Sequence, residues 1–326
     1  MRIWTPELKD RLIGIGYALG WKLICRVPES VARRGFQLAG DIAWRRQGPL
    51  VRQLEANLVR VLGRDVEAAT LSKVSRAAMR SYARYWLETF RLPVMPMDRL
   101  VGGMWPDGHY DKVEEFRKEG RGIVFALPHM GNWDQAGAWF IANGAGSITA
   151  VVERLKPESV YQKFVAYREG LGMEVLPASG GARPFGILAQ RLRAGSIVVL
   201  VADRDVTGTG AEVEFFGEGC MMQPGSAALA VQTGAALMPV VLWFTEDGWG
   251  ARVGEEIPVP PEGSRKEKVA AMMQEVARFF EDGIREHPED WHMLQPVFAA
   301  DLDPERQAAA RSRAARSGRL DGQEVL

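Results

Sequence analysis

The sequence predicts an α/β protein with a central, mostly parallel sheet flanked by helices and a helical N-terminal region. From about residue 110, apolar β-prone runs alternate with helical stretches. Such alternation is typical of a parallel sheet covered by helices on both faces. The first hundred residues have apolar positions at spacings of three and four, which indicates helices. A composition of 47% hydrophobic and 25% charged residues allows a sizeable core.

The expected elements follow this spacing. In the N-terminal region, helices are expected near 7–25, 29–46, 50–62 and 67–91. Strands are expected at 122–127, 148–152, 173–176, 197–201 and 239–244, with further helices near 132–142, 157–171, 183–193, 224–234 and 264–285. We divide the chain into a helical region (1–100), an α/β core (101–303) and a flexible C-terminal tail (304–326).

Charge is balanced over the whole chain, with 41 Lys+Arg and 41 Asp+Glu among 326 residues, so nothing indicates nucleic-acid binding. Residues 1–62 differ, because they hold 11 Lys/Arg against 5 Asp/Glu and include apolar stretches. A basic, amphipathic start suits an anionic membrane surface, although a solvated helical face has the same pattern. We therefore interpret this part of the chain as a membrane-docking region.

No stretch is expected to cross the membrane. The longest uncharged run near the start, Leu12 to Trp21, is shorter than the roughly 20 residues that a spanning helix needs. A longer uncharged run, 219–245, contains Pro and Gly and is interpreted as a helix followed by a buried strand. Some aromatic side chains of the first two helices, such as Trp4, Trp21 and Trp44, are expected at the lipid interface.

Neither a disulfide nor a metal site is expected. Cys25 and Cys220 are far apart, which fits a reducing compartment. Residues 286–292 include two His and three acidic side chains, but Pro288 breaks any shared helical face and the spacing is not that of HExxH. Trp291 and His292 are expected to pack or hydrogen-bond near the functional site.

Reactive side chains follow three of the expected strands. His129 comes after the first strand, the Glu153–Arg154 pair after the second, and Asp203, Arg204 and Asp205 after the fourth. Because sites in parallel sheets form at the carboxyl ends of the strands, we expect these side chains to converge.

His129 has the properties of a general base. The next helix is expected to begin near Asn132, so that Asp134 lies in its first turn and reaches back toward the imidazole. A neutral imidazole can take the proton of a hydroxyl that attacks a thioester, and a carboxylate behind the ring fixes its tautomer and stabilises the imidazolium. The sequence has no Gly-x-Ser-x-Gly nucleophile elbow. A single His is also often structural, so its position at a strand exit is what favours catalysis.

Several segments together resemble the late acyltransferases of lipid A biosynthesis and their actinobacterial relatives, the phosphatidylinositol mannoside acyltransferases. The first segment has the HxxxxD form of that family. The matching segments are LPHMGNWD (127–134), VERLKPE (152–158), ADRD (202–205), FFG (215–217) and HPEDWHML (287–294).

The resemblance implies an enzyme that transfers a long acyl chain, palmitoyl, from acyl-CoA to a glycolipid. The acceptor would be the 6-hydroxyl of the 2-linked mannose of a phosphatidylinositol mannoside, at the cytoplasmic face of the inner (plasma) membrane, where the enzyme is peripheral. No cofactor is implied beyond acyl-CoA as donor substrate. The apolar groove for the acyl chain is expected between the N-terminal region and the sheet.

The resemblance also implies roles for individual residues. His129 is the base and Asp134 its supporting carboxylate, and Asp203 belongs to a block whose carboxylate is thought to pair with the histidine. Which of the two carboxylates contacts the imidazole stays open. The implied substrate-binding residues are Glu153, Arg154, Arg168, Arg204 and Asp205.

Other interpretations stay open. Glu153–Arg154 could be a surface ion pair, Arg168 part of a solvated helix face and 203–205 a turn. The loop 179–183 could hold a phosphate or be a plain connection. The chain could also be a lipid A-type acyltransferase that uses acyl carrier protein, a non-catalytic lipid-binding protein, or a hydrolase that uses the same histidine and water.

Overall fold

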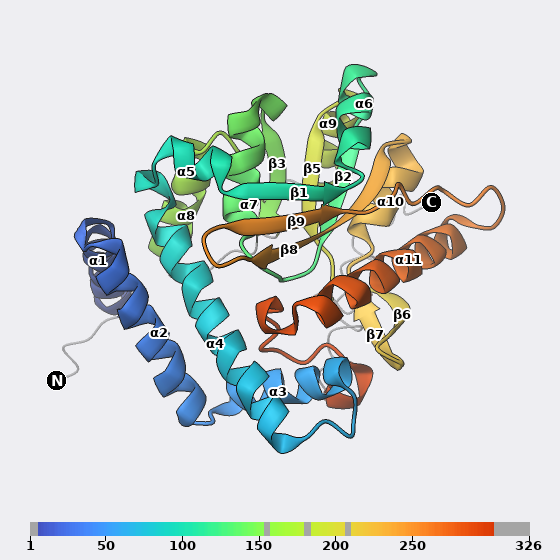
Figure 1. Cartoon of the computed structure of the whole chain (residues 1–326). Coiled ribbons are helices and arrows are strands. Elements are labelled where there is room, and N and C mark those ends of the chain that lie inside the picture. The colour runs from blue at the N-terminus through green and yellow to red at the C-terminus, as the bar shows by residue number, and fades with distance from the viewer. Residues whose placement is uncertain (1–5, 153–156, 179–183, 206–209, 303–326) are drawn as a thin grey trace.

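A computed structural model of the chain describes residues 6–152, 157–178, 184–205 and 210–302. Its centre is a seven-stranded sheet with the strand order β1-β9-β8-β2-β5-β3-β4 (Figure 1). Neighbouring strands are parallel except β8 and β9, which pair antiparallel. The α/β class with a mostly parallel sheet is therefore confirmed.

The elements have the following bounds. The N-terminal part contains α1 (Pro6–Arg26), α2 (Glu29–Arg45), α3 (Pro49–Leu62), α4 (Ala68–Arg91) and α5 (Met97–Gly102). The strands of the large sheet are β1 (Met104–Gly108), β2 (Ile123–Leu127), β3 (Ile148–Val152), β4 (Glu174–Pro177), β5 (Ile197–Val201), β8 (Ala236–Phe244) and β9 (Trp249–Val253). The other helices are α6 (Tyr110–Lys118), α7 (Trp133–Phe140), α8 (Glu158–Gly170), α9 (Pro184–Arg193), α10 (Gly225–Thr233) and α11 (Arg265–Glu286). A separate antiparallel hairpin joins β6 (Ala211–Phe215) to β7 (Glu218–Met222).

Helices cover both faces of the sheet (Figure 1). One face packs against α9, α10 and α11 around side chains such as Leu188, Leu229 and Phe280. The other face packs against α5, α6, α7 and α8. Side chains alternate between the two cores along each strand, as the two-residue repeat of a strand requires: Val124 and Ala126 of β2 belong to the first core, and its odd-numbered residues to the second.

The N-terminal helices form a layer beside the sheet, with α4 running past the strand ends (Figure 1). α3 and α4 share a core that includes Leu54, Leu58 and Met79 and that also receives Leu294 from the C-terminal part. Asp41 of α2 accepts hydrogen bonds from Arg76 and Arg80 of α4, which fastens these two helices together. The helical region is thus packed onto the core; the division of the chain at residue 100 stays a prediction.

Sequence spacing located most, but not all, of the elements. The nine expected helices and five expected strands are present with ends shifted by a few residues at most. Within 219–245, α10 and β8 confirm the helix and the buried strand, while the first residues of that stretch belong to β7. α5, α6, β1, β9 and the β6–β7 hairpin were not expected.

Two expectations about the membrane have different outcomes. None of the helices in the described ranges is both long and apolar enough to cross a bilayer. Trp21 packs among Phe90, Phe164 and Tyr167, and Trp44 donates a hydrogen bond to Ser75, so both have partners within the protein; a place at the lipid interface stays a prediction. Trp4 and the expected C-terminal tail lie outside the described residues.

Candidate active site

The turn that carries His129 is built by its neighbours. β2 ends at Leu127, and α7 begins at Trp133 with Asn132 as its N-cap, whose Oδ1 accepts the amide N–H of Gln135 at 3.0 Å. This confirms the expected helix start. Gly131 has φ +61°, and a Cβ there would lie 2.7 Å from the carbonyl carbon of Leu242. Only glycine fits this close approach without strain, so the turn that presents His129 has a fixed shape.

A second strand exit brings a carboxylate to His129. β5 lies beside β2, with Val201 opposite Leu127, so Asp203 follows at the level of the histidine. Its Oδ1 lies 2.6 Å from His129 Nδ1, and its Oδ2 accepts the His129 backbone N–H at 2.8 Å. The Asp203 side chain is fully buried, whereas 31% of the His129 side chain is exposed. The ring therefore has its Nδ1 engaged, and among the described residues no hydrogen bond engages its Nε2, which can serve a reacting group.

The environment keeps Asp203 ionised. Burial acts to raise the pKa of this carboxyl group, but His129, the Trp291 indole N–H and the His129 amide together hold the pKa below its ordinary value. A carboxylate of this kind orients the imidazole and stabilises the positive charge that forms when the ring takes a proton. The pair of His129 and Asp203, called the dyad below, has the geometry of a general base.

Asp134 does not support the imidazole as expected. It lies in the first turn of α7, but its carboxylate accepts hydrogen bonds from Arg168 Nε at 2.6 Å and Nη2 at 3.1 Å, and from Tyr85 Oη at 3.3 Å. His129 precedes the helix, so the two side chains have no shared helical face, and Asp134 turns toward α8 and α4. The carboxylate that pairs with the ring is Asp203.

Arg168 is the buried partner of Asp134. Burial acts to lower the pKa of the Arg168 guanidinium, but Asp134 outweighs this effect and raises the pKa. The expectation of a plain solvated helix face at Arg168 does not hold, since only 13% of its side chain is exposed. Arg168 and Asp134 both line the cavity that adjoins the dyad.

An apolar cavity runs between the sheet and α7. The indole of Trp133 lines it and packs edge-on against the His129 ring, with 5.9 Å between ring centroids. Its floor consists of side chains from six strands, and its roof includes Ala136, Gly137 and Phe140. The strand residues are Met104, Pro106, Phe125, Leu127, Ile148, Ala150, Val151, Val152, Val199, Val201, Val240, Leu242, Ala251 and Val253. The described lining of this cavity thus comes from residue 104 onward, so the cavity itself does not lie between the N-terminal region and the sheet; where the acyl chain binds stays a prediction.

A family comparison decides the class of the protein. Residues 9–299 match the family described as bacterial lipid A biosynthesis acyltransferase. The chain belongs to this acyltransferase family. Its relatives include two proteins named phosphatidylinositol mannoside acyltransferase, from Mycolicibacterium smegmatis and Mycobacterium tuberculosis. The first is 46% identical over 302 residues, covering 92% of this chain and 96% of the relative. The second is 46% identical over 305 residues, covering 91% and 92%.

Of the remaining predicted site residues of this acyltransferase, some have described surroundings and others lie outside the described residues. Asp205 accepts the Gly210 amide at 2.8 Å and the Gln223 side-chain amide at 3.3 Å. Arg204 is partly buried beside it. Glu153, Arg154 and the loop 179–183 lie outside the described residues. Substrate contacts by Arg168, Arg204 and Asp205 stay predictions.

Sequence reasoning placed some supporting residues and missed others. The expected hydrogen bonding near the site by Trp291 and His292 is confirmed, because the Trp291 indole N–H donates to Asp203 and the His292 amide donates to the His129 carbonyl. Tyr85, which contacts Asp134, was missed. It lies 49 residues before its partner in a regular helical pattern, and nothing local distinguishes it from a core tyrosine.

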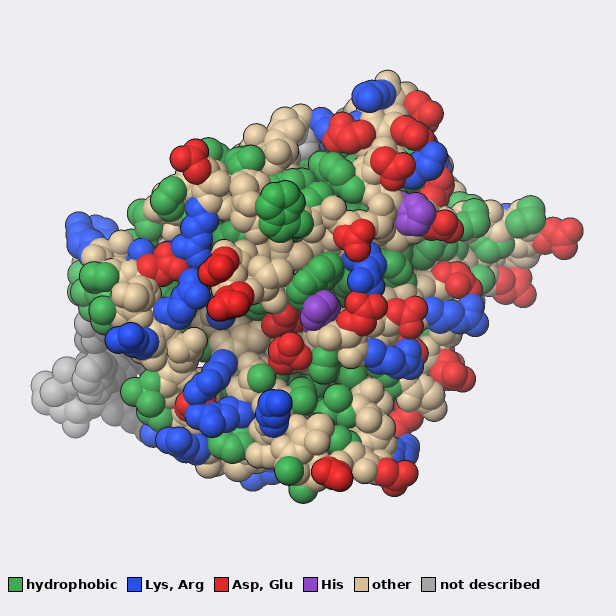
Figure 2. Space-filling view, in the orientation of Figure 1, with side chains coloured by type: hydrophobic (Ala, Val, Ile, Leu, Met, Phe, Trp, Pro, Cys, Tyr) green, Lys and Arg blue, Asp and Glu red, His purple; other side chains and the backbone are tan. Residues whose placement is uncertain are grey.

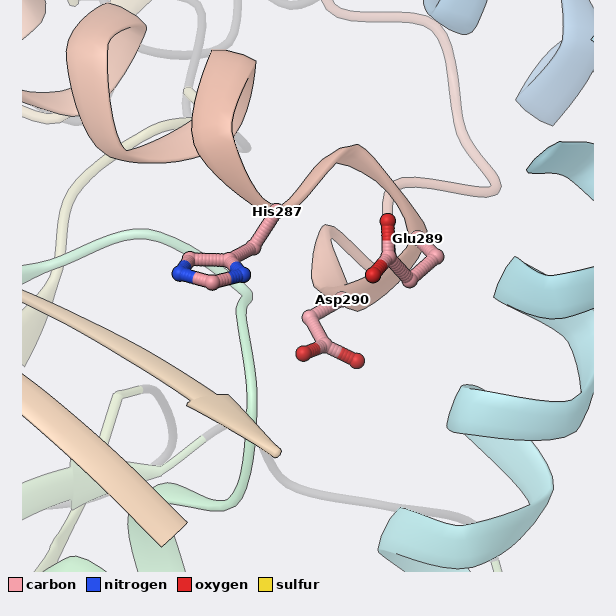
Figure 3. Close-up of side chains that lie close together, drawn as sticks. All are labelled: His287, Glu289 and Asp290. Carbon is pink, nitrogen blue, oxygen red and sulfur yellow. The ribbon is translucent and has the colours of Figure 1, made fainter. Parts of the chain in front are cut away.

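Three side chains after α11, those of His287, Glu289 and Asp290, lie close together (Figure 3). Possible ligand atoms of His287, Glu289 and Asp290 lie within 4.8 Å of one another. However, Asp290 already accepts hydrogen bonds from Ser81 Oγ and the Phe244 amide, and the His287 ring stacks on Trp243 at 4.7 Å. That the acyltransferase needs no metal stays an expectation.

Proposed function

We propose that this acyltransferase moves a long acyl chain, palmitoyl, from acyl-CoA to the 6-hydroxyl of the 2-linked mannose of a phosphatidylinositol mannoside. The observation that carries the proposal is the dyad beside an apolar cavity, because it joins a base for a hydroxyl to a compartment for an acyl chain. The acceptor is taken from the two relatives that share 46% identity over more than nine-tenths of this chain.

His129 and Asp203 provide the acid–base chemistry of this proposal. His129 Nε2 takes the proton of the mannose hydroxyl while the hydroxyl oxygen attacks the thioester carbonyl carbon. Asp203 holds Nδ1 and stabilises the imidazolium. When the tetrahedral intermediate collapses, the C–S bond breaks, the new ester remains, and the imidazolium returns its proton to the leaving thiolate of CoA. No covalent acyl-enzyme and no further cofactor take part.

The cavity provides the binding energy for the chain. Its lining is almost wholly apolar, and one of its side chains, Trp133, packs against His129. Burying a hydrocarbon chain contributes about 0.8 kcal/mol per CH₂. The long-chain thioester is thus held with its carbonyl next to His129. The Asp134–Arg168 pair joins α7 to α8 and gives the cavity lining its charged side chains, which we propose lie near the head group of a substrate.

The helical region supports a peripheral position on an anionic membrane, at the cytoplasmic face of the inner membrane. α1 exposes Ile15, Leu19 and Leu23 at spacings of four, and α2 exposes Leu38 and Ile42 at the same spacing. Exposed basic residues flank these ridges, namely Lys22, Arg26, Arg34, Arg45 and Arg46. Figure 2 shows Lys and Arg side chains gathered over the N-terminal helices on one face. Apolar ridges flanked by cations are typical of helices that lie in a membrane interface.

A lipid A-type reaction with acyl carrier protein as donor is the second candidate, because the matching family is described by lipid A biosynthesis. A matrix of two donors and two acceptors separates the candidates. The enzyme is supplied with palmitoyl-CoA or palmitoyl-carrier protein, each with a phosphatidylinositol mannoside or a lipid A precursor. We expect the largest kcat/KM with palmitoyl-CoA and the mannoside. Activity confined to the carrier protein and the lipid A precursor would overturn the proposal.

The same assay addresses the hydrolase and the non-catalytic alternatives. A transferase diverts acyl groups from water to sugar when the mannoside is added, so free fatty acid falls as acylated mannoside rises. Unchanged release of fatty acid at saturating acceptor would establish a hydrolase, and tight acyl-chain binding without any turnover would establish a carrier.

A further inference from the structure

The segment 290–292 is paired with the turn that carries His129. Met130 and Trp291 form an antiparallel β-bridge. The Gly131 amide donates to the Asp290 carbonyl at 3.0 Å, and the His292 amide donates to the His129 carbonyl at 2.7 Å. The backbone from the His129 carbonyl to Gly131 is therefore held by a segment far away in the sequence.

The side chain of Trp291 acts on the other member of the dyad. Its indole Nε1–H donates to Asp203 Oδ2 at 3.0 Å, and both side chains are fully buried. Oδ2 also accepts the His129 amide, so both lone pairs of this oxygen are occupied. Oδ1 is left to face the imidazole, and the carboxylate cannot rotate without losing two buried hydrogen bonds.

A buried anchor fastens this segment to α4. Ser81 Oγ donates to Asp290 Oδ1 at 2.5 Å and lies 2.8 Å from His292 Nε2. Asp290 Oδ2 accepts the Phe244 amide at 2.8 Å. Ser81, Asp290 and His292 are all buried. Because Ser81 holds residues on both sides of Trp291, the indole has little freedom to shift away from Asp203.

We propose that Trp291 is a positioning residue of the dyad: its indole N–H selects the orientation of Asp203 that aligns His129 Nε2 with the attacking hydroxyl, and the Ser81 anchor keeps the indole in place. This inference rests on the proposed function, since the aligned group is the base of the acyl transfer. Trp291 itself does not touch a substrate.

Trp291→Phe and Trp249→Phe form a matched pair for the test. Trp249 is also a fully buried indole, and its Nε1–H also donates to a buried carboxylate, that of Glu88, at 2.7 Å. Trp249 does not line the cavity and has no described contact with the dyad; because Glu88 also accepts the Asn132 side-chain amide, Trp249→Phe controls for a general loosening of the turn that carries His129. We expect Trp291→Phe to lower kcat for palmitoyl transfer by ~10- to 100-fold with little change in KM, since small misplacements of a base cost factors of this size.

The pH profile distinguishes positioning from a loss of folded protein. The acidic limb of kcat/KM should move to higher pH in Trp291→Phe, because the positive end of the indole dipole no longer opposes protonation of the neighbouring ring. Trp249→Phe should keep the wild-type profile. Equal kcat and equal profiles for the two variants, both shown to be folded by circular dichroism, would overturn the proposal.

Two further measurements keep the outcome decisive. The first is the proton resonance of His129 Nδ1, which is assigned by its loss in His129→Gln. It should change in Trp291→Phe but not in Trp249→Phe, and an unchanged resonance in both variants would overturn the inference. This result does not depend on activity; a wild-type protein that transfers no acyl groups would refute the proposed function instead.

If Trp291→Phe does not fold, Ser81→Ala replaces it. Ser75→Ala is its control, because Ser75 is another buried serine of α4 that joins a carboxylate to a ring N–H, far from the dyad. We expect a loss of about 3- to 10-fold in kcat for Ser81→Ala, and a loss equal to that of Ser75→Ala would overturn the proposal.

Discussion

The two faces of the central sheet are made of the same residue types but are packed differently. The face under α9, α10 and α11 is closed, with Phe280, Leu229 and Leu237 fully buried. The opposite face leaves the cavity beneath α7, and Val199 and Val201 of β5 stay partly exposed there. Since protein interiors are normally filled to the density of organic crystals, a persistent apolar void indicates a place for a ligand.

α7 contributes two small residues to the wall of the cavity. Ala136 and Gly137 line it beside the larger Trp133, Trp139 and Phe140, whereas Leu229 of α10 and Phe280 of α11 fill the closed face. At Gly137 even a Cβ would lie 2.6 Å from the tip of Met173. Glycine in a helix interior costs about 1 kcal/mol relative to alanine. Stability is therefore lower on this face in the place where the acyl chain is proposed to bind.

The largest contrast is expected from truncating one phenylalanine on each face. Phe280→Ala on the closed face should cost about 3–5 kcal/mol, because it removes a fully buried ring and leaves a new void. Phe125→Ala enlarges the existing cavity and should cost clearly less. Urea unfolding of both variants measures this. Equal losses would show that the cavity face is packed as tightly as the other.

Larger side chains should be tolerated better on the cavity face than on the closed face. Ala227→Leu on the closed face should destabilise by about 1–3 kcal/mol through overpacking. Ala136→Leu fills part of the cavity, so stability should be nearly unchanged while transfer of palmitoyl falls more than transfer of shorter chains. Denaturation curves measure the stability of both variants, and kcat/KM for C8 to C16 donors measures the chain-length preference of Ala136→Leu. A chain-length profile that Ala136→Leu leaves unaltered would mean that the acyl chain binds elsewhere.

The free energy of unfolding should depend on pH, because Asp290 and His292 are buried titratable groups near the dyad. Burial raises the pKa of Asp290 to about 7, against opposing hydrogen bonds from Ser81 and Phe244, while burial lowers the pKa of His292 to about 3. A carboxyl group with a raised pKa stabilises the fold when it is protonated, and this contribution is lost as pH rises from about 4 to about 7.

Asp290→Asn removes the titration of this carboxyl group; the variant also loses one of the two hydrogen bonds that Asp290 accepts, but that loss is the same at both pH values. The variant should therefore lose more stability relative to wild type at pH 5 than at pH 8, by a difference on the order of 2 kcal/mol. His292, with its lowered pKa, has the opposite trend and is present in both proteins, so it cancels in the comparison. Urea titrations at the two pH values give the result, and a cost independent of pH would mean that Asp290 is ionised throughout.

The smallest difference in stability is expected between substitutions of two neighbouring residues of β5. Val198 faces the closed side of β5, and Val199 faces the cavity. Val198→Ala should cost about 1.5 kcal/mol from the lost methyl groups, and Val199→Ala less, because its side chain is already partly exposed. Thermal unfolding of the pair resolves this difference. A larger loss for Val199→Ala would contradict the assignment of the faces.

Local patterns in the sequence account for the elements that were found and for those that were missed. Helices with regular apolar spacing and strands of continuous apolar residues, such as 123–127 and 197–201, are visible because burial on one or two faces fixes their pattern. β1 contains Pro106 and Gly108 and β9 is interrupted by Gly250 and Arg252, which an edge strand and its neighbour tolerate but a pattern search does not recognise. The β6 strand alternates with Glu residues and is short.

The sequence predicted which strand ends carry the site residues, but not how the side chains there are arranged. The rule that strand ends converge correctly brought together His129 and Asp203. The choice of Asp134 as the carboxylate behind the ring relied on sequence proximity, whereas Arg168 of α8 and Tyr85 of α4 determine where Asp134 points. These contacts come from tertiary packing, as does the position of the cavity under α7. Neither has a local signature.

The most direct test of the account is the transfer rate of His129→Gln with palmitoyl-CoA and a phosphatidylinositol mannoside. His109→Gln, which changes an exposed histidine paired with Glu255, is the control. We predict that His129→Gln folds normally and loses about 10²- to 10⁴-fold in the single-turnover rate, while His109→Gln matches the wild type. A folded His129→Gln variant that transfers palmitate at the wild-type rate would contradict the assignment of His129 as the base.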